Sequence, residues 1–190
     1  MRVVAGSARG TRLAPVPAGT RPMTDRAREG LFSSLGEAVV GARVLDLFAG
    51  TGALGIEALS RGAARAVFVD SSPAAVATIR ENLRRTKLEE RAAVRRADAL
   101  RAVGPAAREE GPFDLVLLDP PYRLPARALR ALLEALARPG VVRPGGVVVL
   151  SRPKKSSTPV IPVHWAIAKE LSYGDSAVYV LRVPESEGGR

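Results

Sequence analysis

The chain has 190 residues, 46% of them hydrophobic, which is enough for one domain with a sizeable core but not for two full domains. It contains no cysteine and a single histidine, His164, so disulfides, thiolate chemistry and zinc–sulfur sites are excluded and no metal site is expected. No apolar run reaches the roughly 18 residues of a membrane span, and the N-terminus lacks a sustained apolar segment. We therefore expect a cytoplasmic protein with no membrane partner.

The formal net charge of +10 and the sequence pI of 11.1 favour a polyanionic partner, because basic side chains that neutralise phosphates release counterions. Almost all of this charge is arginine, whose guanidinium forks onto phosphate and stacks on bases. An alternative interpretation is a basic, Arg-rich and Ala-rich proteome of a high-GC organism. The two interpretations are compatible.

Residues 1–22 predict a small basic extension. Two short β-prone pieces flank the turn-forming residues 6–10, which predicts a hairpin. Its arginines have no acid among them, so the segment is interpreted either as a phosphate clamp or as a solvated, poorly ordered tail. These arginines are Arg2, Arg9, Arg12 and Arg21.

A helix is expected next, capped by Thr24 or Asp25 and running to Leu35. Its apolar side should pack against the sheet, next to the glycine-rich loop described below. Arg26 and Arg28 should then face outward or toward the site.

From Arg43 onward, short apolar strands alternate with helical patterns. This order predicts a mostly parallel sheet covered by helices on both faces. Two final strand-like runs follow each other without a helix and predict an antiparallel hairpin that closes the sheet. The expected strands are 43–47, 66–70, 92–97, 113–118, 146–151, 166–171 and 177–183, and the expected helices are 53–61, 73–85, 99–108 and 125–137.

The glycine-rich loop after the first strand is expected to bind a nucleotide cofactor. Gly50, Gly52 and Gly55 have the spacing of the dinucleotide fingerprint. Asp46 just before them would repel a pyrophosphate, whereas S-adenosylmethionine (SAM) carries a sulfonium and an ammonium group and no phosphate. The loop therefore favours SAM over NAD. Asp70, which closes the next strand, is expected to accept from the ribose hydroxyls that both cofactors share.

Further cofactor contacts are expected at the third strand. Asp98 is interpreted as an acceptor for the adenine amino group, as the N-cap of the helix 99–108, or as both. Glu57, on the helix that follows the glycines, is interpreted as a surface charge without a role. The expected cofactor-binding set is Asp46, Phe48, Gly50, Gly52, Asp70, Asp98 and Ala99.

The sheet pattern agrees with this choice of cofactor. Five strands in βα order followed by a hairpin are typical of the seven-stranded, Rossmann-like sheet of SAM-dependent methyltransferases, rather than of the two symmetric halves of an NAD domain. We expect an α/β fold with this domain at residues 23–184, the basic hairpin extension at 1–22 and a flexible tail at 185–190.

The tetrapeptide Asp119-Pro120-Pro121-Tyr122 follows the fourth strand and should emerge at the same sheet edge as the glycine loop. An aromatic amine is a poor nucleophile, because its lone pair is delocalised into the ring. A carboxylate from Asp119 and the carbonyl of Pro120 can each accept one N–H and draw that nitrogen toward tetrahedral geometry. Tyr122 offers a ring on which a planar base can stack. These catalytic assignments compete with a simple strand-ending turn capped by the aspartate.

Several stretches together resemble the RsmD family of bacterial 16S ribosomal RNA guanine-N2 methyltransferases, over nearly the whole chain. The cofactor loop and the tetrapeptide occur in many amino-methyltransferases, whereas the Arg-Pro-x-Thr-Asp-Arg segment is far more specific. The stretches are Gly6 with Arg9-Gly10, Arg21-Pro22-Met23-Thr24-Asp25-Arg26, the loop from Asp46 to Gly55 with the helix after it, Asp119-Pro120-Pro121-Tyr122, and Tyr173-Gly174-Asp175-Ser176.

The resemblance implies that SAM donates a methyl group to N2 of one guanine of 16S rRNA, guanine 966 in the usual small-subunit numbering. It implies an assembled or assembling 30S particle as the substrate, with ribosomal proteins as further candidate partners, and we expect a monomeric enzyme. The implied RNA-binding residues are Arg2, Arg9, Arg12, Arg21, Arg26 and Arg28.

Two positions depart from the family pattern. Met23 stands where the family usually has threonine, and Ser151-Arg152 replaces an acid that members often carry after the fifth strand. The second change should add positive charge near the RNA side. Three other functions stay open from the residues alone: a methyltransferase for DNA or small-molecule amines, an NAD-dependent oxidoreductase, and a non-catalytic rRNA-binding assembly factor.

Overall fold

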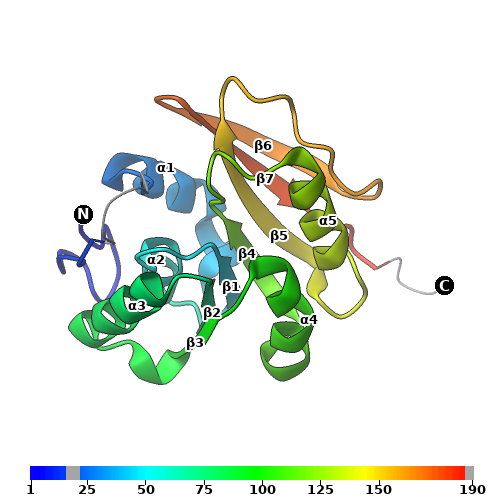
Figure 1. Ribbon diagram of the computed structural model, residues 1–190. Coiled ribbons are helices and arrows are strands. Elements are labelled where there is room, and N and C mark those ends of the chain that lie inside the picture. The colour runs from blue at the N-terminus through cyan, green and yellow to red at the C-terminus, as the bar shows by residue number, and fades with distance from the viewer. Residues whose placement is uncertain (16–21, 187–190) are drawn as a thin grey trace.

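A computed structural model describes residues 1–15 and 22–186 of the chain (Figure 1). One sheet runs through the molecule, with helices on both sides. The helices are α1 (Asp25–Leu35), α2 (Ala53–Ser60), α3 (Pro73–Thr86), α4 (Ala99–Glu110) and α5 (Ala126–Leu136), and 3-10 turns occupy Gly36–Val39 and Glu89–Arg91. The strands are β1 (Arg43–Leu47), β2 (Arg65–Asp70), β3 (Ala92–Arg96), β4 (Phe113–Leu118), β5 (Val142–Pro153), β6 (Ala166–Tyr173) and β7 (Ser176–Arg182).

The sheet has seven strands in the order β3-β2-β1-β4-β5-β7-β6. Strands β1 to β5 pair in parallel, and β7 pairs antiparallel with both β5 and β6. The predicted α/β fold, mostly parallel with an antiparallel C-terminal hairpin, is confirmed. The chain order reverses at β1, whose neighbours are β2 and β4, and this is where open α/β sheets bind ligands.

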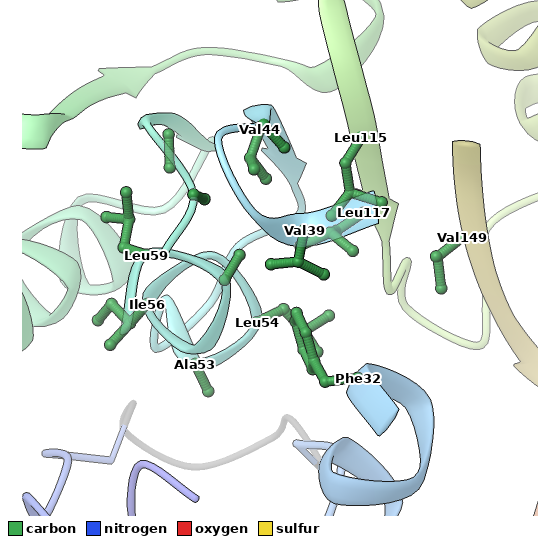
Figure 2. Close-up of a cluster of buried hydrophobic side chains, with 14 of the residues drawn as sticks. Phe32, Val39, Val44, Ala53, Leu54, Ile56, Leu59, Leu115, Leu117 and Val149 are labelled. Atoms are coloured by element: carbon green, nitrogen blue, oxygen red, sulfur yellow. The ribbon is translucent and has the colours of Figure 1, made fainter. Parts of the chain in front are cut away.

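Two apolar layers hold the sheet between the helices. Side chains of neighbouring strand residues point to opposite faces, so Val44 packs under the α1–α3 side while Leu45 packs under α4 and α5. Figure 2 shows the first layer, in which Phe32 of α1 and Leu54 of α2 meet Leu117 of β4. Because helices cover both faces of the sheet, the central strands consist mostly of apolar residues.

The predicted element bounds agree with the structure to within two residues, except at β5. This strand begins at Val142 rather than at residue 146. Val142 pairs with Phe113, and the register then shifts before Val147 pairs with Leu115. Gly145, with a φ of +74°, takes up the irregularity. Residue 146 was the expected start of this strand, but Gly145 and Gly146 form a bulge inside it.

The N-terminal residues pack onto the domain. A single antiparallel bridge joins Arg2 and Arg12, so the predicted hairpin is present in its shortest form. Val3, Ala8 and Leu13 are buried in the same apolar layer as α1 and α2. For residues 1–15, the interpretation as a solvated, poorly ordered tail is wrong. Residues 16–21, which include Arg21, and residues 187–190 of the predicted tail lie outside the described residues.

Glu57 fastens this extension to α2, and its interpretation as a surface charge is wrong. Its side chain is fully buried, and its carboxylate accepts from the backbone amides of Val4 at 2.9 Å and Ala5 at 3.0 Å. The same carboxylate pairs with Arg61 at 2.8 Å and lies 4.0 Å from the buried Arg28. A buried carboxylate needs such partners, and here they come from three separate segments.

Within residues 1–15 and 22–186, no helix has both the length and the apolar character required to cross a membrane.

We predict that Glu57→Ala lowers the free energy of unfolding by about 3–5 kcal/mol, because it leaves two amides without acceptors and removes one of the two carboxylates beside the buried Arg28. Urea unfolding followed by circular dichroism measures the change. Glu81→Ala is the control, since it removes an exposed acid that pairs with Arg84 and Arg85 on α3, and it should leave the midpoint nearly unchanged. Equal stability of the two variants would contradict the role of Glu57.

Candidate active site

The loops after β1 and β4 emerge side by side. Leu47 pairs with Leu118 in the parallel ladder, so residues 48–52 and the tetrapeptide from Asp119 leave the sheet at one edge. Asp70 ends β2, the other neighbour of β1. The structure therefore brings the predicted cofactor loop and the predicted catalytic tetrapeptide to the same edge.

Glycine is required at two points of the cofactor loop. Gly52 caps α2 with a φ of +79°, in the left-handed region that other residues seldom adopt. A Cβ at Gly55 would overlap the ring of Phe68 and come within 3.0 Å of Asp46 Oδ2. This close approach lets the Gly55 amide donate to Asp46 Oδ2 at 3.0 Å. Phe48 also has a positive φ, of 57°, so the chain turns sharply as soon as β1 ends.

The loop amides are largely taken by protein acceptors. The Gly50 amide donates to Asp70 Oδ2 at 2.9 Å, the Gly52 amide to the Ala49 carbonyl at 2.7 Å, and the Ala53 amide to Thr51 Oγ1 at 3.2 Å. A pyrophosphate would need free backbone amides in such a turn. Here these amides already donate to protein acceptors. Carboxylates at the loop and amides turned inward fit a cofactor that carries positive charge and no phosphate, as SAM does.

The carboxyl of Asp46 is 1% exposed and lies beneath the loop. Burial raises its pKa to about 8 against the opposing hydrogen bond from Gly55, and the charges of Asp119 and Asp70 raise it further. A cation held above this carboxyl would favour its ionised form. The mutual influence of Asp46 and Asp119 also means that the two predicted sites share one electrostatic environment.

A cavity of about 590 Å³ opens beside the tetrapeptide. Asp119 and Tyr122 form one wall, residues 22–27 at the start of α1 form another, and the hairpin tip between β6 and β7 forms a third. Burial raises the pKa of the Asp119 carboxyl to about 6, and the hydroxyl of Ser151 on β5 opposes that shift by hydrogen bonding. The cavity is of the size and polarity that a nucleobase requires.

The tetrapeptide presents its groups in a fixed arrangement. The Pro121 carbonyl accepts from the Leu124 amide at 3.0 Å and closes a turn. The Pro120 carbonyl accepts no hydrogen bond from any described residue. The Tyr122 hydroxyl lies 3.1 Å from Ser176 Oγ, which ties a half-exposed ring to the hairpin tip. An aromatic ring and a carboxyl thus meet at one side of the cavity, and the Pro120 carbonyl belongs to the turn between them.

Residues 1–182 match the family model described as Conserved hypothetical protein 95. The putative rRNA methyltransferase YlbH of Bacillus subtilis is 37% identical over 183 residues, which cover 96% of this chain and 98% of that protein. The ribosomal RNA small subunit methyltransferase D of Escherichia coli is 34% identical over 190 residues, covering 99% of this chain and 92% of that protein. The chain belongs to the RsmD family.

Solved structures agree with this RsmD assignment. A putative methyltransferase, yhhF from Escherichia coli, superposes with a TM-score of 0.84 at 32% identity and covers 97% of this chain and 98% of its own. A protein from Streptococcus mutans described as a putative SAM-dependent methyltransferase shares the fold at 17% identity and a TM-score of 0.66, covering 84% of this chain and 48% of its own. The predicted cofactor, SAM, agrees with the fold of these neighbours.

The expected cofactor set of this RsmD member divides into two groups. Gly50 and Gly52 lie in the loop between β1 and α2, and the carboxyls of Asp46 and Asp70 accept from amides of this loop and of α2. Phe48, Asp98 and Ala99 lie toward α4. Phe48 packs on the apolar layer beneath α4 and α5, and the carboxylate of Asp98 accepts from the Arg101 amide at 3.1 Å. Asp98 is therefore the N-cap of α4, and its exposed carboxylate retains acceptor capacity for a ligand.

The predicted RNA-binding arginines require one correction. Arg2, Arg9, Arg12 and Arg26 are exposed, whereas Arg28 is fully buried. Its guanidinium donates to the carbonyls of Arg2 and Met23 and to the carboxylate of Asp25. Arg28 therefore ties α1 to the N-terminal hairpin and is removed from the expected RNA-binding set. The helix pattern alone did not show that α1 turns this side chain toward α2.

The departure at Ser151-Arg152 also needs correction. Both side chains are buried, so Arg152 adds no positive charge to the surface. Ser151 was noted only as a substitution, yet it lies on the cavity wall and hydrogen bonds to Asp119. The parallel pairing of β4 with β5 places it there. Its position at the end of the expected strand 146–151, next to the strand that leads into the tetrapeptide, was the available signal.

We predict that the Asp119 carboxyl titrates near pH 6 rather than near its ordinary value of 3.8. It is then about nine-tenths ionised at pH 7 and mostly protonated at pH 5. Ser151→Ala should move the midpoint to higher pH, because the hydroxyl stabilises the carboxylate. Carbon-13 NMR of labelled aspartate measures both midpoints. Ser156→Ala serves as the control, since that hydroxyl donates to the Pro153 carbonyl instead. A lower midpoint in Ser151→Ala would contradict this assignment.

Proposed function

We propose that this protein transfers a methyl group from SAM to the exocyclic N2 amine of a guanine in 16S ribosomal RNA. The substrate is the small ribosomal subunit or one of its assembly intermediates, in the bacterial cytoplasm. The observation that carries the proposal is the cavity lined by Asp119 and Tyr122, whose turn leaves the sheet at the same edge as the cofactor loop. The names of the Bacillus and Escherichia relatives support rRNA as the substrate class.

The tetrapeptide suits a planar amine that must be made nucleophilic. The N2 amine has two hydrogens, and the Asp119 carboxylate and the unpaired Pro120 carbonyl can each accept one of them. These two bonds hold the nitrogen and direct its lone pair out of the plane of the base. The Tyr122 ring, held by Ser176, supports the base by stacking, which contributes about 1–3 kcal/mol.

SAM, when bound, supplies an electrophilic methyl group on a sulfonium. The chain's own residues for holding it are Asp70, whose carboxylate already orders the Gly50 and Ser72 amides, and the loop over Asp46. Asp119 has a further role after the N–C bond forms and the carbon–sulfur bond breaks. The alkylated nitrogen must then lose a proton, and a carboxylate with a pKa of about 6 can accept it.

The guanine must leave its base stack to enter the cavity. RNA loops allow this at least cost, which agrees with the usual way in which proteins read RNA bases. Around the cavity, the amide of Arg2 donates to Asp25 at 3.4 Å and the Arg2 carbonyl accepts from Arg28. The arginine-bearing hairpin therefore adjoins the start of α1, which carries Arg26 on the cavity rim. Because the hairpin arginines and Arg26 lie on adjoining segments, they could together bind the phosphates on both sides of the target nucleotide.

We predict that the purified protein methylates 30S particles from a strain lacking this modification, and that nucleoside mass spectrometry of the product shows N2-methylguanosine. Asp119→Ala should lower the rate by at least about 100-fold, because both the acceptor for N–H and the proton acceptor are lost. Isothermal titration should show SAM affinity within about threefold of the wild type. Equal loss of binding and transfer would contradict the role of Asp119. Methylation of duplex DNA instead of rRNA would overturn the substrate assignment, and rRNA binding without transfer would identify an assembly factor.

We predict that Arg9→Ala and Arg12→Ala each weaken binding to 30S particles and reduce the slope of log affinity against log salt by roughly 0.7–0.9, as expected for one lost phosphate contact. Filter binding at several salt concentrations measures this slope. Arg130→Ala is the matched control, because Arg130 is exposed on α5, which packs on the opposite face of the sheet from the N-terminal hairpin, and pairs with Glu134 at 3.0 Å. A slope change equal to that of the control would exclude the hairpin from the interface.

A further inference from the structure

We propose that Asp175 selects guanine by accepting the N1–H of the base in the cavity. This proposal rests on the proposed function and extends it to a second acidic group. Asp175 lies at the tip of the hairpin between β6 and β7 and lines the same cavity as Asp119, which enters from β4. The cavity thus presents two carboxylates from separate walls.

The position of Asp175 is fixed by its neighbours on both sides. Its carbonyl accepts from the Lys154 amide at 2.8 Å, which joins the tip to the end of β5. Ser176 bonds with the Tyr122 hydroxyl, and Tyr173 packs its hydroxyl over Gly30 of α1, where a Cβ would overlap it. A tip held at three points presents its acid at a constant place in the cavity, as discrimination between bases requires.

The carboxylate of Asp175 forms no ion pair or hydrogen bond with any described residue. It is exposed on the wall of a cavity that, under the proposed function, receives a polyanion. An unpaired acid there repels phosphate and loses water when a base enters, and both effects weaken binding. An N–H donor on the base offsets these costs.

Guanine has the matching donors. Its Watson–Crick edge carries two N2 hydrogens and one N1 hydrogen, whereas adenine has a bare N1 that would face the acid with a lone pair. Asp119 and the Pro120 carbonyl account for the two N2 hydrogens, which leaves N1–H for Asp175. Arg26 on the same rim is a donor of the kind that O6 requires. The two acids therefore have separate tasks, with activation of N2 by Asp119 and recognition of N1–H by Asp175.

The test compares guanosine with 2-aminopurine riboside at the methylated position of reconstituted 30S particles. The analogue keeps the reactive amine but has a bare N1 and lacks O6, so the change in preference caused by Asp175→Asn is what reports on N1. Wild-type protein should prefer guanosine by at least about 100-fold in kcat/KM, since a site built to pair with an N–H rejects a substrate lacking it. In Asp175→Asn the amide can donate to the bare N1, so the preference should fall at least about tenfold, with the analogue gaining activity. Glu170→Gln, an exposed acid on β6 outside the cavity lining, should leave the preference unchanged.

The possible results distinguish failure of the Asp175 recognition role from failure of the proposed guanine methylation. Equal loss of activity on both substrates in Asp175→Asn, or an unchanged preference, would overturn the recognition role of Asp175 while leaving guanine methylation intact. A melting temperature equal to that of the wild type shows that the variant is folded, and Asp175→Ala, which cannot donate, should lose activity on guanosine without gaining it on the analogue. Failure of the wild-type protein to methylate guanosine would instead refute the proposed function and this inference with it.

Discussion

The parallel pairing of β1 with β4 is the constraint on which the site depends. Because Leu47 and Leu118 lie opposite each other in this ladder, the chain leaves both strands at one edge. The turn after β1 lies between the carboxyls of Asp46 and Asp70 and directs amides to them, and the turn after β4 holds Asp119 and the Pro120 carbonyl. A shift of one residue between these strands would place Asp46 and Asp119 on opposite faces of the sheet. The apolar layers on both faces prevent that shift, so core packing fixes the geometry of the chemistry.

Burial gives the acids of this edge different tasks. Asp46 lies beneath the loop, with a pKa near 8, and its charge is unfavourable unless a cation is close. Asp119 lies at the cavity wall, where the Ser151 hydroxyl limits the rise of its pKa to about 6. At neutral pH the first carboxyl is mostly protonated in the free protein and the second is mostly ionised. One sheet edge therefore carries an acid that responds to a cationic ligand and an acid that is ready to accept hydrogen bonds and a proton.

The repeating pattern made most of the fold predictable. Apolar strands of five or six residues between helical periods give the parallel sheet, and the two adjacent runs at the end give the hairpin. Local motifs also placed the glycine loop and the tetrapeptide, since each follows a strand directly. Contacts between distant segments could not be predicted in this way. Glu57 and Arg28 look like ordinary helix charges in sequence, and only the packing of α1, α2 and the hairpin shows that they are buried partners.

The cavity itself shows why its third wall escaped prediction. The start of α1 and the β6–β7 tip are separated by about 150 residues, and their approach depends on a missing side chain, since any Cβ at Gly30 would collide with Tyr173. Lys169 adds a second link by donating to the Ser34 carbonyl at 3.0 Å. α1 also holds the N-terminal hairpin through Arg28. The helix is therefore joined at one side to the arginines proposed to bind phosphate and at the other to the tip proposed to read the base. Under the proposed function, phosphate binding at the hairpin and base binding at the tip would both act on α1, so the two should reinforce each other.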